Sequence, residues 1–233
     1  MTRGRRFSRK REVAIGLSAY AVYLLVRAAV MNGKGNEKAA RNAERVVELE
    51  RRLGIHVEPD LQRAVLPYRR LIHVLNLSYA TLNVGLTVGY LMLLFSRRHP
   101  EFHRLRRATV LTILGAEPAF LWFPTAPPRK LDHMVDTIAE VSKLDLDAGL
   151  IAKLYHPLAA MPSIHVAFAV VSGAAMAETA ESALVRRLAP GYPPLVALVV
   201  FVTANHYLLD AVAGAALGAA GLEFARRLEP GDA

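Results

Sequence analysis

The chain has 233 residues, of which 53% are hydrophobic and only 21% are charged. Its charges lie in clusters between long apolar runs, which is typical of integral membrane proteins and excludes an ordinary soluble domain. Without cysteine, the chain can form neither disulfides nor thiolate metal sites. The net charge of +9 does not indicate nucleic-acid binding, because the basic residues flank apolar segments and no aromatic residues interleave with them. Membrane topology and attraction to anionic lipid account for it instead.

The first apolar segment covers residues 13–31 and follows a basic stretch, residues 3–11. This arrangement could be mistaken for a secretory signal. The apolar run is longer than the core of a usual signal, and no convincing small-residue cleavage site follows before Arg27. We therefore expect a retained membrane anchor.

The segment 32–70 is polar, but its apolar residues recur at intervals of three and four, which predicts an amphipathic helix. A second short helix is expected to start near Asp60. Two interpretations are open, namely a helix lying on the membrane surface and a helix packed against the rest of the protein. The periodic residues, followed by Gly54 as a helix stop, are Ala39, Ala43, Val46, Leu49 and Leu53.

Six apolar segments are long enough to be membrane-spanning helices, since a bilayer core needs roughly 20 residues of helix. The sequence therefore predicts an all-α fold, a polytopic bundle of six transmembrane helices with an interfacial amphipathic helix. We expect one domain over residues 1–233, with a basic cytoplasmic tail at 1–12 and a core at about 40–225. The six segments are residues 13–31, 71–95, 108–123, 161–177, 190–204 and 207–225.

The positions of Lys and Arg predict the orientation, because basic residues are enriched on the cytoplasmic side. Four basic clusters alternate onto one side of the predicted bundle, which we assign to the cytoplasm. The segment 32–70 opposes this assignment with nine Lys and Arg on the outer side, although they are diluted and interleaved with Glu. The four clusters are the amino-terminal tail, residues 96–107, Arg186 with Arg187, and Arg226 with Arg227.

His206 and Asp210 are four residues apart at the start of the sixth segment, so they share one helical face. A carboxylate there can hold the Nδ1 proton of the ring, which leaves Nε2 free to attack and stabilises the developing positive charge. The alternative is a packing pair that satisfies two polar groups inside the bundle.

His165 is expected in the first turn of the fourth helix, after Pro162 at the helix start and Ser163 as its cap. The exposed backbone N–H groups of such a turn favour an anion. A protonated His165 could donate a proton to a leaving-group oxygen. The alternative is a satisfied histidine at the membrane interface.

Arg129 follows Pro127 and Pro128, a stiff lead that should hold it near the interface. A guanidinium group donates two parallel hydrogen bonds to phosphate oxygens. Lys130 could add a point charge to the same phosphate, or it could be an ordinary interfacial lysine.

All these side chains are expected on the outer membrane face. Together they indicate phosphoryl transfer through a phosphohistidine, a reaction that requires no metal and no cofactor. A zinc site made of His165, His206 and Asp210 is a rival interpretation, against which the nearby Arg129 argues. A non-catalytic lipid carrier is a rival of another class, supported by a packing motif of small residues at Gly214 and Gly218. We expect the charges of Glu117 and Arg27 within spans to be paired or to reach the interface.

The motif Pro162-Ser163-x-His165, with His206-x-x-x-Asp210, resembles two of the three motifs of the type 2 phosphatidic acid phosphatase superfamily. This resemblance implies a six-helix membrane core in which His206 is the phosphorylated nucleophile and Asp210 its partner. It further implies that His165 is the acid and that Ser163 binds the phosphate. Substrates would be lipid phosphates or diphosphates, and association with further copies of the chain is compatible with it.

Two departures from the superfamily pattern weaken the expected phosphate clamp. Pro127-Pro128-Arg129 replaces the usual first motif, and residues 198–203 lack the arginine that usually precedes the third. These departures, and the segment 53–62, are similar to the branch containing inositol phosphorylceramide synthase and sphingomyelin synthase. We expect a lipid phosphatase in the cell membrane with an extracytoplasmic site. Transfer of a phospho-head group to an alcohol such as inositol is the alternative.

Overall fold

The computed structural model describes residues 7–131, 134–143 and 156–228, whose regular structure is helical apart from one isolated bridge between Thr125 and Ala159. Short turns connect some of the helices, namely η1 (Ser78–Leu82), η2 (Pro128–Lys130) and η3 (Ala189–Gly191). The helices are α1 (Arg9–Val30), α2 (Gly33–Arg52), α3 (Glu58–Val65), α4 (Arg69–Leu77), α5 (Asn83–Ser96), α6 (Phe102–Trp122), α7 (Thr137–Glu140), α9 (Ile164–Thr179), α10 (Ala183–Leu188), α11 (Tyr192–Val202) and α12 (Leu208–Arg227).

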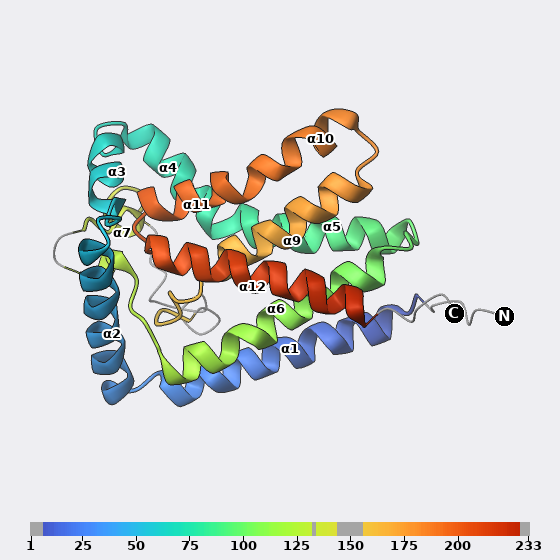
Figure 1. Ribbon diagram of the computed structural model, residues 1–233, viewed down its shortest axis with the longest axis horizontal. Coiled ribbons are helices and arrows are strands. Elements are labelled where there is room, and N and C mark those ends of the chain that lie inside the picture. Colours follow the sequence, from blue (N-terminus) through green and yellow to red (C-terminus); the bar gives the residue numbers. More distant parts are fainter. Residues whose placement is uncertain (1–6, 132–133, 144–155, 229–233) are drawn as a thin grey trace.

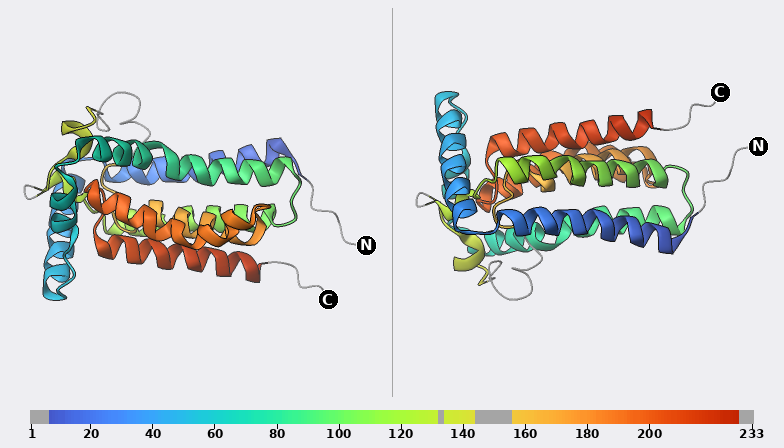
Figure 2. Two further views of the ribbon diagram at one scale, coloured as in Figure 1. Left: turned by 90° about the horizontal axis from the view of Figure 1, so that it is seen from above. Right: turned by 90° about the horizontal axis from the view of Figure 1, so that it is seen from below.

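The long helices run side by side as a bundle, and α2 lies across one of its ends (Figures 1 and 2). Helix α12 packs against α6 and α9, α1 packs against α6, and α11 packs against α9. The first turn of α1 and the last turn of α12 lie at the end of the bundle opposite α2 (Figure 1). The polar helices α2, α3 and α7 therefore gather at one end, and the described chain starts and stops at the other.

Each of the six predicted apolar segments is helical, and the chain is all-α within its described residues. Three stretches there are long and apolar enough to cross a membrane, namely α1, Ala183–Val202 and α12. Helix α9 is apolar but has only 16 residues, and α6 carries several charged residues. Helices at the predicted positions are thus observed, while a topology of six spans stays a prediction.

The second predicted span, residues 71–95, is bent. The helical stretch Arg69–Thr81 meets Val84–Ser96 at an angle of 48°. Near the bend, the hydroxyl groups of Ser78 and Thr81 donate hydrogen bonds to the carbonyls four residues earlier, at 2.8 and 2.7 Å. Such side-chain bonds compete with the helical ladder and bend helices, and the two stretches together can form one broken span.

Helix α2 places most of its predicted apolar stripe against protein. Ala39, Ala43 and Val46 are buried in a cluster that includes Tyr207 of the loop before α12. Leu49 and Leu53, which the periodicity placed on the same stripe, are instead exposed. The predicted stop is observed, since Gly54 adopts a φ of +68° just after α2. Packing against the bundle is therefore observed for the first half of the stripe, and a membrane-surface location stays a prediction.

Helix α12 packs against α9 through Gly214 and Gly218, and we call this contact the glycine seam. A Cβ atom on Gly214 would lie 2.2 Å from the carbonyl oxygen of Ser163, and one on Gly218 would lie 2.6 Å from that of Ala167. Only hydrogen side chains allow two backbones to approach so closely. This seam fixes the start of α12 directly beside the start of α9.

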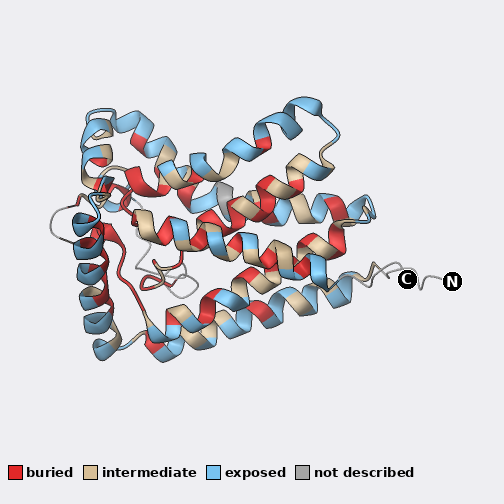
Figure 3. Ribbon diagram, viewed as in Figure 1, coloured by how far each residue is buried: buried red, intermediate tan, exposed pale blue. Residues whose placement is uncertain are grey.

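The outer sides of the bundle are exposed and apolar. Figure 3 shows long exposed stretches on α1, α5 and α10, with buried residues concentrated on α9 and near α2. Leu25 on α1 and Met92 on α5 are 71% and 67% exposed. Exposed apolar surface of this extent is typical of helices that face lipid.

The basic clusters predicted to share one membrane side lie at one end of the bundle. The turn between α5 and α6, helix α10 and the end of α12 are all at the end opposite α2 (Figure 1). Two ion pairs connect elements there, since Arg97 lies 2.5 Å from Glu181 and Arg104 pairs with Glu178. Which end faces the cytoplasm stays a prediction.

Candidate active site

The structure brings five of the six predicted site residues together at the end of the bundle near α2. Ser163 and His165 come from the start of α9, His206 and Asp210 come from the start of α12 and the loop before it, and Arg129 comes from η2. Lys130 is exposed on the same short turn on which Arg129 is buried. The buried cluster therefore includes Arg129 and leaves Lys130 at its edge.

The two histidine rings face each other although they are 41 residues apart in sequence. Their centroids are 5.5 Å apart, and Nε2 of His206 lies 3.4 Å from Nδ1 of His165. The two ring nitrogens are therefore near enough to act on the same bound group.

The other ring nitrogen of His206 is surrounded by acceptors. Its Nδ1 lies 2.8 Å from the carbonyl oxygen of Ala160 and 3.4 Å from Oδ2 of Asp210. Because the carbonyl oxygen of Ala160 can only accept, the proton of a neutral ring belongs on Nδ1 and Nε2 carries the lone pair. The sequence predicted this tautomer but assigned it to Asp210 alone, whereas the backbone carbonyl is the closer partner. Asp210 also accepts a hydrogen bond from the backbone N–H of Tyr207 at 3.0 Å.

His206 lies in a buried environment that favours its neutral form. The pKa of His206 is lowered from 6.5 to about 4, mainly by burial and also by the positive charge of Arg129, although the hydrogen bond to Ala160 opposes the shift. The ring is therefore neutral at neutral pH, with Nε2 available as a nucleophile.

Arg129 is held rigidly beside this ring. Its Nε donates to Oδ1 of Asn205 at 3.1 Å, and its guanidinium is paired with Asp136 at 3.0 Å. Its backbone N–H also donates to the carbonyl of Ala204 at 2.8 Å. Two bonds to the residues just before His206 thus fix both the main chain and the side chain of Arg129.

Ser163 caps α9, as the sequence predicted. Its Oγ accepts a hydrogen bond from the backbone N–H of Val166 at 3.3 Å. Its own backbone N–H donates to the carbonyl of Asp210 at 2.9 Å. The hydroxyl proton of Ser163 is still available to a ligand, because the cap uses only the oxygen lone pair.

Three contributors to the site had no assigned role at the sequence level. The ring of Tyr79 stacks on His165 with centroids 4.4 Å apart, and Asn205 and Asp136 position Arg129. Asn205 could have been predicted as a site residue, because it directly precedes His206 in the sequence. Tyr79 comes from the bend at η1, and no local pattern connects it to α9.

A comparison with protein families adds to this geometry. A model described as the PAP2 superfamily matches residues 44–224 of the chain. The chain belongs to the PAP2 superfamily. Its members are generally phosphatases or phosphotransferases, so the chain is an enzyme of this broad class. No curated protein and no solved structure matched the chain in two further comparisons.

Membership in the PAP2 superfamily, together with the apolar helices, identifies a membrane protein. The matched range begins within α2 and ends within α12. It therefore includes the whole buried cluster and nearly coincides with the range of the resemblance seen in the sequence.

Proposed function

We propose that this PAP2-superfamily chain is an integral membrane phosphatase that releases phosphate from a lipid phosphate or diphosphate through a phosphohistidine at His206. One observation carries the proposal. The unprotonated Nε2 of His206 faces Nδ1 of His165 at 3.4 Å, in a buried cluster with Arg129. A bare ring nitrogen, a second ring able to carry a proton and a fixed guanidinium are the groups that phosphoryl transfer requires.

In the first step, the lone pair on Nε2 of His206 attacks phosphorus. The bond between phosphorus and the lipid oxygen breaks, and that oxygen takes a proton from His165, which enters the step as an imidazolium and leaves it as a neutral ring. The positive charge that forms on His206 is stabilised at Nδ1 by Asp210 and by the carbonyl of Ala160. Nε2 of His206 and Nδ1 of His165 are 3.4 Å apart, which leaves no room for a phosphoryl group between them. Substrate binding must therefore move the two rings apart.

In the second step, water attacks the phosphohistidine and gives its proton to His165. The bond between nitrogen and phosphorus breaks, inorganic phosphate leaves, and His206 returns to its neutral form. Arg129 and the hydroxyl of Ser163 donate to the phosphate oxygens in both steps. An alcohol in place of water would give transfer instead of hydrolysis.

Transfer to an alcohol is the second candidate, because the Pro-Pro-Arg and Asn-His-Tyr segments resemble the branch of inositol phosphorylceramide and sphingomyelin synthases. We would assay the purified full-length chain in detergent with phosphatidate, an isoprenyl diphosphate and a ceramide-based donor, each with and without inositol. Phosphate release without inositol supports hydrolysis, and formation of inositol phosphate supports transfer. His206→Ala should abolish either reaction.

The other rival interpretations give opposite results in simple controls. Phosphohistidine chemistry should survive a chelator and be inhibited by vanadate, whereas a zinc site at His165, His206 and Asp210 would give the reverse. A non-catalytic lipid carrier would keep its cellular function in the His206→Ala variant. Loss of cellular function with this variant would therefore contradict the carrier interpretation.

We further propose six spans in one domain, with the buried cluster on the extracytoplasmic side. The chain has no cysteine, so a single introduced thiol can be labelled without background. In intact cells, an impermeant maleimide should label Lys130→Cys at the site end. It should label Arg186→Cys at the other end only after the membrane is opened. The opposite pattern would refute the orientation.

A further inference from the structure

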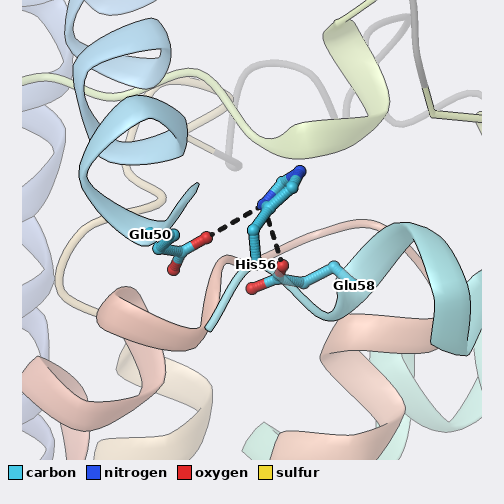
Figure 4. A group of neighbouring side chains, drawn as sticks. All are labelled: Glu50, His56 and Glu58. Atoms are coloured by element: carbon cyan, nitrogen blue, oxygen red, sulfur yellow. Dashed lines mark hydrogen bonds and ion pairs between the residues drawn. The ribbon is translucent and has the colours of Figure 1, made fainter. Parts of the chain in front are cut away.

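A second polar cluster lies between the end of α2 and the start of α3. Glu50 comes from the last turn of α2, His56 from the following turn, and Glu58 from the first position of α3. The two carboxylate side chains are 0% and 1% exposed, and the imidazole is 12% exposed. Figure 4 shows both carboxylates pointing toward the same nitrogen of the His56 ring.

The three donor atoms converge as the ligands of a metal ion do. Nδ1 of His56 lies 3.3 Å from Oε2 of Glu50 and 3.2 Å from Oε2 of Glu58. One ligand atom from each of the three residues lies within 4.8 Å of the others. Tetrahedral zinc with bonds of about 2.1 Å separates its ligand atoms by about 3.4 Å, which is close to the two distances from His56.

The remaining carboxylate oxygens are already occupied by the start of α12. Oε1 of Glu50 accepts the backbone N–H of Leu209 at 2.8 Å, and Oε1 of Glu58 accepts that of Leu208. These N–H groups belong to the first turn of α12 and have no partner within the helix. The Oε2 atoms are therefore directed away from α12, toward His56.

The negative charge of this cluster is not compensated by a basic side chain. Within the described parts of the chain, the ion pairs of Glu50 and Glu58 are with His56 alone. Oε2 of Glu58 is buried and accepts no hydrogen bond, even though it lies 3.2 Å from the imidazole nitrogen. Two buried carboxylates side by side are costly unless a proton or a metal ion binds between them.

We propose that Glu50, His56 and Glu58 bind one divalent transition-metal ion of the zinc class, which fastens the turn between α2 and α3 to the start of α12. The imidazole ligand favours zinc over magnesium or calcium, which prefer oxygen ligands alone. The ion is structural, because its ligands reach the first turn of α12 through their other oxygens. The site goes beyond the proposed reaction, whose steps use no metal.

Metal analysis of the full-length chain tests this site. The protein is purified in detergent with an affinity tag free of histidine and without chelator. The wild type should retain about one equivalent of zinc. Glu58→Gln, which removes one ligand charge, should retain at least tenfold less. The matched control Glu48→Gln changes an exposed glutamate on α2 that pairs with Arg52 and should retain as much as the wild type.

A second measurement uses the wild-type protein, so its main result does not depend on whether a variant folds. Wild-type protein stripped with a chelator should gain thermal stability when Zn²⁺ is added back, and Mg²⁺ at the same concentration should have no effect. His56→Gln should lose this response. If the wild type holds less than a tenth of an equivalent and Zn²⁺ leaves its unfolding midpoint unchanged, the proposal is overturned, and a shared proton occupies the cluster.

The metal site and the proposed reaction can fail separately. His206→Ala should abolish phosphate release and leave the zinc content unchanged, because His206 contacts none of the three ligands in the hydrogen bonds and ion pairs of the described residues. Loss of zinc together with phosphate release in that variant would instead place the ion in the reaction centre and refute a structural role.

Discussion

Protonation of His206 should destabilise the folded protein in mild acid. Burial lowers its pKa from 6.5 to about 4. Because the folded state favours the neutral ring, the resulting stability is fully present above pH 6.5 and is lost as the pH falls toward 4. A pKa difference of about 2.5 corresponds to about 3 kcal/mol, most of which should disappear between pH 6.5 and 4.5. His206→Asn removes this titration and keeps an N–H donor for Ala160.

Thermal unfolding of detergent-purified protein at these two pH values measures the effect. For a chain of this size, about 3 kcal/mol corresponds to a midpoint change of roughly 6–12 °C. The wild-type midpoint should fall by this much more than that of His206→Asn. His73→Asn, which removes an exposed histidine on α4, should behave as the wild type does. Equal decreases of the unfolding midpoint in the wild type and in His206→Asn would refute the assignment of a neutral, buried His206.

Three further substitutions test the packing and the site. Gly214→Ala places a methyl group against the backbone carbonyl of Ser163, so the unfolding free energy should fall by about 1–3 kcal/mol. Gly16→Ala, with open space around it in α1, should not lower the unfolding free energy in the same denaturation assay. Arg129→Lys keeps the charge but loses the planar donor pair, and kcat/KM for phosphate release should fall roughly 10- to 100-fold. An unchanged kcat/KM would contradict a role of Arg129 in phosphate binding. Tyr207→Phe deletes a buried hydrogen bond of 3.0 Å and should lower the unfolding midpoint by the equivalent of about 1–3 kcal/mol; a wild-type midpoint would contradict this role.

The positions of the helices were predictable because apolar length and local caps are encoded in short stretches of sequence. Ser163 followed by an apolar run predicted the start of α9, and the cap is observed. The four-residue spacing of His206 and Asp210 predicted that the two side chains lie close together, and they are 3.4 Å apart. The predicted reason was wrong, because His206 precedes α12 and the extended N-cap Tyr207 separates it from the helix. Local periodicity was thus sufficient for the positions of the helices.

Contacts between distant segments were not predictable, because no local pattern encodes them. The stacking of Tyr79 on His165 and the bond from Ala160 to His206 both depend on how separate elements pack. The cluster around His56 was missed for a related reason. The segment 32–70 was interpreted through its apolar periodicity, its basic charges and a family resemblance, and none of these indicated that Glu50 and Glu58 turn inward to reach the start of α12.

Helix α12 has two different sides, one that packs against α9 through the glycine seam and one that is exposed. Its inner side tolerates no added atoms at Gly214 or Gly218, so the geometry of the reacting groups is anchored to bare backbone. Its outward side carries exposed apolar residues such as Val212 and Phe224. Changes on the outward side can therefore alter the exposed surface of α12 while the packing of its inner side against α9 stays the same. The two sides of this one helix can diverge independently.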